Sequence, residues 1–64
     1  MKVRVKEISN VFEFRANFDK PPEQRDYIMY NDNKYAVTNI THEYHTLLDV
    51  VRRKMRLTVI VKEI

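Results

Sequence analysis

Apolar and polar side chains alternate near both ends of this chain. Residues 2–8 read Lys-Val-Arg-Val-Lys-Glu-Ile, and residues 53–64 place apolar side chains at Met55, Leu57, Val59 and Val61. A period of two is typical of strands that have one face in a core and the other in water. Both segments are therefore predicted strands, the second starting near residue 53. The polar face of each is basic, so the two strands would combine their charge if they were neighbours in a closed β-structure.

Two further strand regions follow the first predicted strand. Residues 12–18 alternate three phenylalanines and an alanine with polar side chains, which predicts a strand whose phenylalanines supply the centre of the core. Residues 19–26 contain Pro21-Pro22 and form a predicted loop, because proline cannot donate a hydrogen bond to a strand ladder. Residues 27–30 and 35–38 are β-prone runs on either side of Asn-Asp-Asn-Lys, which predicts a hairpin.

The strand that begins at residue 35 changes its apolar phase between Val37 and Ile40, so a bulge or sharp bend is expected there. Thr46-Leu47-Leu48-Asp49 could cap a short helix, and residues 47–52 are predicted to form either a turn or one helical turn. Five short strands without a long helix indicate an all-β fold. We expect residues 1–64 to form one domain, a small five-stranded, partly open barrel of the SH3-like or OB-like kind.

The length and composition limit the stability and location of the domain. A chain of 64 residues is near the lower limit for independent folding, and without cysteine it has no disulfide to stabilise it. Homodimerisation is a common remedy at this size. Met1 leads directly into the first predicted strand, and no apolar run approaches the roughly 20 residues that span a bilayer. We therefore expect a cytoplasmic protein without a membrane segment.

The sequence argues against nucleotide hydrolysis, nucleophilic catalysis and metal binding. Glycine is absent, and the phosphate-binding loops of nucleotide hydrolases and Rossmann domains require it. Ser9 has no histidine near it in sequence to activate it as a nucleophile. His42 and His45 are three residues apart, so on a strand they would point to opposite faces and could not readily share a metal ion. We expect no enzymatic activity, no cofactor and no metal site.

Positive charge is concentrated at the two ends. Residues 1–6 carry three cations and no acid, and residues 52–64 carry five cations and one acid, whereas residues 7–51 carry four cations and eight acids. Basic strand faces of this kind can be solvated surfaces that discourage aggregation of strand edges. They can also bind a phosphate backbone or an acidic protein surface. The predicted contact residues are Lys2, Arg4, Lys6, Arg52, Arg53, Lys54, Arg56 and Lys62.

Three functions use such a face. The first is occlusion of a protein partner, which the basic face would bind by adding to its sheet or by entering an acidic or DNA-mimicking groove. The second is binding of nucleic acid through phosphates without sequence preference. The third is a structural or accessory-complex component that assembles by strand pairing.

The chain is short, and its hairpin segment reads Tyr-Ile-Met-Tyr-Asn-Asp-Asn-Lys-Tyr-Ala-Val-Thr over residues 27–38. In this and in its content of Asn, Lys, Ile and Tyr it resembles short reading frames of bacteriophages and other mobile elements. The resemblance implies a protein that binds a host or viral macromolecule in the host cytoplasm. Inhibition of a defence complex is one such activity, and some proteins of this sort act as dimers.

Overall fold

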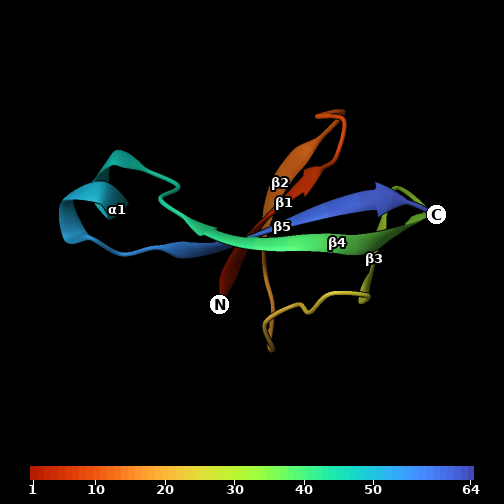
Figure 1. Ribbon diagram of the computed structural model, residues 1–64, viewed down its shortest axis with the longest axis horizontal. Helices are drawn as coiled ribbons and strands as arrows, with labels where there is room; N and C mark the ends of the chain where they lie inside the picture. The colour runs from red at the N-terminus through yellow and green to blue at the C-terminus, as the bar shows by residue number, and fades with distance from the viewer.

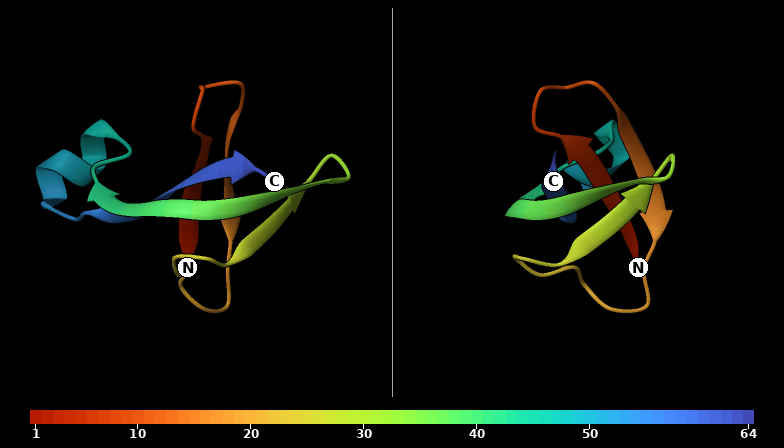
Figure 2. Two further views of the ribbon diagram at one scale, coloured as in Figure 1. Left: turned by 45° about the vertical axis from the view of Figure 1, so that its right-hand side comes forward. Right: turned by 90° about the vertical axis from the view of Figure 1, so that its right-hand side faces the viewer.

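The computed structural model describes residues 1–64 as a single curled sheet of five strands and one short helix (Figure 1). The strands are β1 (Lys2–Glu7), β2 (Glu13–Asn17), β3 (Tyr27–Tyr30), β4 (Asn33–Glu43) and β5 (Arg56–Glu63), and helix α1 (Leu47–Arg52) joins β4 to β5. In the order β2-β1-β5-β4-β3 they curl into a half-barrel (Figure 2). The predicted fold class is confirmed: the protein is a small, open all-β barrel.

The first and last strands are neighbours, as their alternating patterns allowed. β1 and β5 run parallel, with Arg4 opposite Thr58 and Lys6 opposite Ile60. The other three strand pairs are antiparallel. Because side chains alternate between the faces of a sheet, the polar side chains of β1 and β5 lie on the same face, where His45 covers Thr58.

Valine rather than phenylalanine forms the centre of the core. The buried apolar residues are Val3, Val5, Tyr35, Val37, Val59 and Val61. The phenylalanines of residues 12–18 are only partly buried and pack against this cluster, so the prediction that they form its centre was wrong. The reason is topological, since β2 is an edge strand and its side chains have a neighbouring strand on one side only.

Aromatic rings cover the open side of the barrel. β2 and β3 are the two edges of the sheet and do not pair with each other. The ring of Tyr30 on β3 stacks on Phe14 of β2 and on Phe12 just before it, with centroid distances of 4.9 and 4.2 Å. Side-chain stacking therefore joins the two edges where backbone hydrogen bonds do not.

The β3–β4 hairpin is tighter than its sequence predicted. Tyr30 pairs with Asn33, which leaves a two-residue loop in place of the expected four. Asn31 and Asp32 both have positive φ, 50° and 65°, as a type I′ turn requires. In a chain without glycine, Asn and Asp take this role because they tolerate the left-handed region better than other residues.

β4 and β5 continue together beyond the barrel. The register of their pairing shifts between Val37 and Asn39, which confirms the predicted bulge, and pairing then extends to Glu43 opposite Arg56. We call residues 41–58, with α1 at their far end, the arm; α1 lies at one end of the longest dimension of the molecule, 37 Å (Figure 1).

Residues 47–52 adopt the helical alternative of the two that the sequence allowed. β5 begins at Arg56, three residues later than predicted, because Arg53 ends the helix in the left-handed conformation and the Lys54 N–H donates to the Asp49 carbonyl at 2.9 Å.

Candidate functional site

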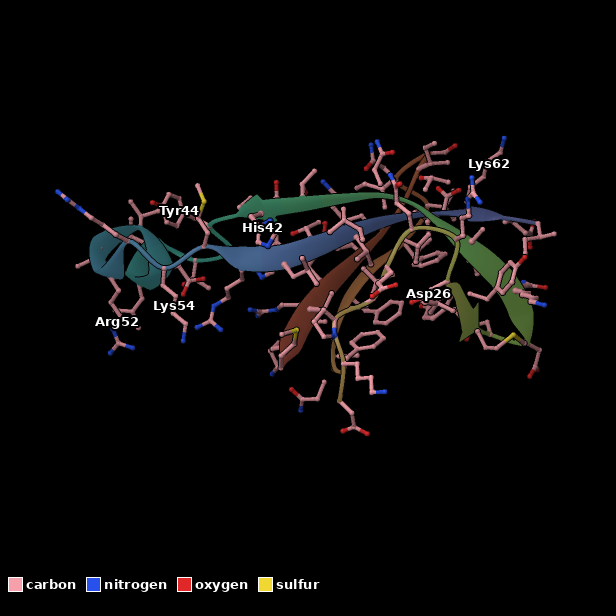
Figure 3. The ribbon with its side chains drawn as sticks, turned by 60° about the horizontal axis from the view of Figure 1, so that its bottom comes forward. Asp26, His42, Tyr44, Arg52, Lys54 and Lys62 are labelled. Carbon is pink, nitrogen blue, oxygen red and sulfur yellow. The ribbon has the colours of Figure 1, made fainter.

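An open groove of about 400 Å³ lies where the start of β1 meets the arm. Met1, Lys2 and Pro21 line it from one side, and the arm contributes His42, Lys54, Met55, Arg56 and Leu57. We call it the cationic groove. Figure 3 shows His42 and Lys54 on the arm. Three of the predicted contact residues, Lys2, Lys54 and Arg56, thus belong to one site.

The parallel pairing of β1 with β5 explains this convergence. Arg4 lies opposite Thr58, so two residues earlier on each strand Lys2 comes beside Arg56 on the same face. An antiparallel pairing would have put the start of β1 beside the end of β5. The groove therefore depends on a topology that the alternating pattern alone does not specify.

The lining of the groove combines positive charge with apolar surface. Lys2, Lys54 and Arg56 supply the charge, Met1, Met55 and Leu57 supply apolar surface, and none of the eight lining residues is acidic. Such a lining can hold carboxylate or phosphate groups beside an apolar side chain.

No family model, curated protein or solved structure matches the chain. This agrees with a resemblance that points to no specific family. The site must therefore be interpreted from its own residues.

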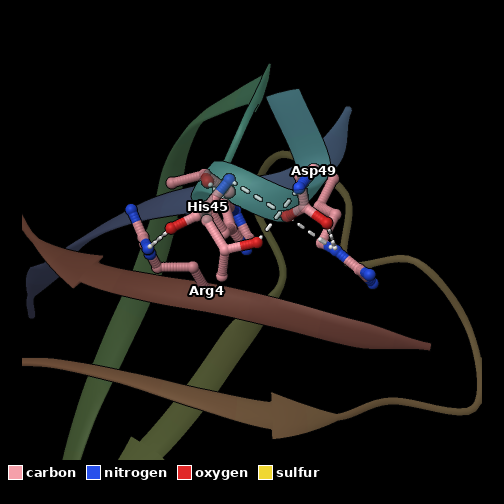
Figure 4. Close-up of polar contacts among 6 residues, drawn as sticks. Arg4, His45 and Asp49 are labelled. Carbon is pink, nitrogen blue, oxygen red and sulfur yellow. Dashed lines mark hydrogen bonds and ion pairs between the residues drawn. The ribbon is translucent and has the colours of Figure 1, made fainter. Parts of the chain in front are cut away.

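A buried carboxylate positions Arg56 at the edge of the groove. Asp49 of α1 is only 3% exposed, and its two carboxylate oxygens accept hydrogen bonds from Arg56 Nε at 3.0 and 2.9 Å (Figure 4). Burial by itself raises the pKa of Asp49, but the hydrogen bond and charge of Arg56, with backbone N–H groups of residues 45 and 46, outweigh it and leave the pKa below its usual value. Sequence reasoning missed this role of Asp49, although it is the one acid beside a run of cations.

Arg4 and His45 join the base of the arm to β1. Arg4 Nη2 donates to the His45 carbonyl at 3.2 Å (Figure 4). Its guanidinium also lies 3.5 Å from Glu13 and 3.9 Å from Glu43. His45 Nε2 is 2.8 Å from Thr58 Oγ1, a hydroxyl that is 1% exposed. Burial and then the charge of Arg4 lower the pKa of His45 from its usual 6.5, against the smaller opposing effects of Glu43 and Asp49.

The eight predicted contact residues thus divide among four places. Lys2, Lys54 and Arg56 line the groove, Arg52 and Arg53 are exposed at the end of α1, Arg4 is half-buried among internal partners, and Lys6 and Lys62 lie elsewhere on the sheet. Figure 3 shows Lys62 far from Arg52 and Lys54. Arg4 and Arg56 are committed to pairs within the molecule, so Lys2 and Lys54 are the freer cations of the groove.

The two histidines are separated. His42 lines the groove, while His45 contacts Thr58. The structure contains no group of three or more His, Cys, Asp or Glu side chains placed to hold a metal ion. Nor does it contain a helix with the length and apolar character to cross a membrane.

Proposed function

We propose that the protein is a non-enzymatic binding protein whose cationic groove receives an acidic segment of a partner protein. By binding there, the protein covers that segment and keeps the partner's other ligands away from it. The observation that carries the proposal is the meeting of Lys2, Lys54 and Arg56 with Met55 and Leu57 in one groove. Protein interfaces typically combine an apolar centre with polar and charged groups at the rim, and arginine is enriched in them.

The aromatic residues support a protein partner over single-stranded nucleic acid. Proteins that bind single strands present aromatic rings on which bases stack. Here Phe12, Phe14 and Tyr30 stack on one another across the open side of the barrel. Lys34 lies over the ring of Tyr27, with Nζ 4.2 Å from its centroid, and no Phe, Tyr or Trp lines the groove, whose one ring is the imidazole of His42. The groove therefore offers charge and apolar contact, and only the His42 ring for a base to stack on.

Binding of nucleic acid through phosphates is the second candidate. It is favoured by the adjacency of β1 and β5, which puts Lys2 and Lys6 on the same face of the sheet as Arg15 of β2 and Arg56 of β5. Such binding would be independent of sequence and would weaken steeply with salt.

The resemblance to short phage proteins supports a place of action in the host cytoplasm, with a host or viral complex as the partner. Occlusion requires only that the groove bind tightly enough to compete with the normal ligand of the partner surface.

A binding experiment separates the two candidates. A fluorescent peptide that alternates Glu or Asp with Leu is compared with its Gln/Asn counterpart and with labelled single- and double-stranded DNA, over about 50 to 500 mM salt. We expect the acidic peptide to bind, the amide peptide to bind at least about tenfold more weakly, and DNA to bind poorly.

Two double variants each remove two positive charges, one variant inside the groove and the other outside it. Lys2→Ser/Lys54→Ser removes two groove cations and should abolish peptide binding, whereas Lys20→Ser/Lys34→Ser removes two exposed lysines outside the groove and should not. DNA binding whose logarithm falls by about 0.9 per contacted phosphate for each tenfold rise in salt would favour the nucleic-acid function instead. Failure of the wild-type protein to bind the acidic peptide at low salt would contradict the proposal.

A further inference from the structure

Strand β5 has an open backbone edge where it enters the arm. β4 pairs with β5 from Arg56 to Glu63, but β1 pairs with it only from Thr58 to Val61. Toward the start of both strands β1 and β5 diverge, because β1 crosses the molecule while β5 follows the arm (Figure 2). Residues 54–57 therefore have no strand beside them on the side where β1 pairs further along.

The backbone groups of this segment point to the open side. The Ile8 N–H donates to the Val61 carbonyl at 2.8 Å, so the backbone of Val61 faces β1. Backbone groups alternate between the two sides of a strand, so those of Val59 and Leu57 face the same way, and Met55 continues this period directly before β5. Neither the N–H nor the C=O of Met55 takes part in any backbone hydrogen bond. A free strand edge of this kind can pair with an extended peptide.

The cationic groove follows this edge and does not lie over one face of the sheet. Residues 54–57 all line it, although successive side chains of a strand point to opposite faces. Lys54 and Arg56 belong to one face, which they share with Lys2, and Met55 and Leu57 belong to the other. A strand placed in the groove would therefore meet positive charge on one of its faces and apolar surface on the other.

Arg56 presents an oriented hydrogen-bonding group at the charged side of the groove. Its Nε is held by both carboxylate oxygens of Asp49, whereas its two Nη groups form no hydrogen bond within the chain and are not buried. The Nη pair of a guanidinium matches the two oxygens of a carboxylate. Because Asp49 already fixes the guanidinium, an acidic side chain that binds there loses little affinity to ordering it.

We propose that the acidic segment binds in the cationic groove as a short added strand, paired with the free edge of β5 at Met55 and Leu57. Its acidic side chains face Lys2, Lys54 and Arg56. Its apolar side chains alternate with them along the segment and face the methionine and leucine. This inference rests on the proposed function and adds the conformation and the sequence pattern of the ligand. Backbone pairing supplies affinity, and the alternating side chains supply selectivity.

The sequence pattern is tested with two labelled peptides of the same composition. One alternates Glu with Leu, and the other has all its Glu residues in one block and all its Leu residues in a second block. Fluorescence anisotropy should show at least about tenfold tighter binding of the alternating peptide, because only that peptide matches both faces of the groove. Equal affinities would overturn the added strand, while an acidic ligand for the groove would still be supported.

The backbone pairing is tested by N-methylation of the alternating peptide. In a strand only every second N–H faces a given neighbour, so one peptide is methylated at its Leu residues and another at its Glu residues. One of the two should lose affinity by at least about tenfold and the other should bind as the parent peptide does. A loss in the Leu set would identify antiparallel pairing, and a loss in the Glu set parallel pairing. Equal effects of the two sets would overturn the proposal.

Amide hydrogen exchange gives a readout on the protein itself. Saturating alternating peptide should slow exchange of the Met55 N–H at least about tenfold. The Tyr44 N–H is the matched control, since it also takes part in no backbone hydrogen bond but lies outside the groove, and its exchange should not change. Binding without protection of Met55 would overturn the added strand alone. Failure of every acidic peptide to bind at low salt would overturn both this inference and the proposed function.

Discussion

At the scale of single residues, the join between barrel and arm depends on a few polar side chains with little access to water. His45 contacts the buried Thr58 hydroxyl, and its carbonyl accepts from Arg4. Forty-one residues separate Arg4 from His45, so no local pattern in the sequence links them. The sequence could identify these residues only as a basic strand residue and a surface histidine, because their role depends on the register between β1, β4 and β5.

The lowered pKa of His45 leads to a pH dependence of stability. The folded protein binds the proton less readily than the unfolded chain, whose histidine titrates near 6.5. The unfolded state therefore carries more protons just below that pH, and stability that is complete above pH 6.5 is lost as the pH falls toward the lower pKa of the folded state.

We expect the melting temperature to fall between about pH 7.5 and 5.5, and the fall to be smaller in His45→Gln. The matched control is His42→Gln, which should keep the wild-type decrease because His42 is exposed in the groove. Thermal denaturation followed by circular dichroism measures both. An identical pH profile in wild type and His45→Gln would show that another group is responsible.

At the scale of elements, local sequence patterns predicted which strands and helix form better than they predicted where each element begins and ends. All five strands, the bulge after Val37 and a helical turn at 47–52 follow from period, phase and capping residues. The start of β5 and the length of the β3–β4 loop do not, because Arg53, Asn31 and Asp32 adopt left-handed conformations that the side chains permit but do not require. A glycine at any of these three positions would have indicated a left-handed conformation in the sequence itself.

The hairpin turn between β3 and β4 should be easy to stabilise. Asp32 has φ of 65° at the second loop position, where Asn-Gly is the preferred pair for a type I′ turn. Asp32→Gly should therefore raise the free energy of unfolding by up to about 1 kcal/mol, since it removes the steric cost of the left-handed conformation.

Urea denaturation measures this gain. Asp19→Gly serves as the control, because it makes the same replacement at an exposed loop residue without positive φ, and it should leave stability unchanged or lower it. A loss of stability in Asp32→Gly equal to that in Asp19→Gly would mean that the turn gains nothing from glycine.

At the scale of the whole molecule, the barrel combines a valine core with an aromatic closure. The period of the strands indicates which side chains share a face, but the same period fits parallel and antiparallel neighbours. For that reason the sequence could predict two basic faces, while their meeting in the cationic groove required the strand order β2-β1-β5-β4-β3. The exposure of the apolar side chains of α1 was missed for a similar reason, since Leu48 and Val51 look like ordinary core residues until the helix is seen beyond the barrel.

The aromatic closure predicts which edge residues matter for stability. Phe14 pairs with Val5 across the β1–β2 ladder and stacks on Tyr30, so Phe14→Ala should remove contacts with both the core and the opposite edge. We expect a loss of about 3 kcal/mol, a large share of the stability of a domain of this size.

Tyr27→Ala is the matched control, because Tyr27 is also an aromatic residue of an edge strand but is 59% exposed. Urea denaturation should show a small change for Tyr27→Ala and a midpoint shift several times larger for Phe14→Ala. Equal shifts would indicate that stacking across the gap contributes little.

The pairing of β1 with β5 also has a consequence for how the protein is made. Val59 and Val61 lie beside Val3 and Val5 in the core, yet they are synthesised roughly fifty residues later. Until residues 56–63 have emerged, β1 has only the edge strand β2 as a neighbour, and its inner face stays open to water. The pairing of β1 with β5 can therefore form only after residues 56–63 have been made, and until then the growing chain must avoid unwanted partners with β1 incompletely paired.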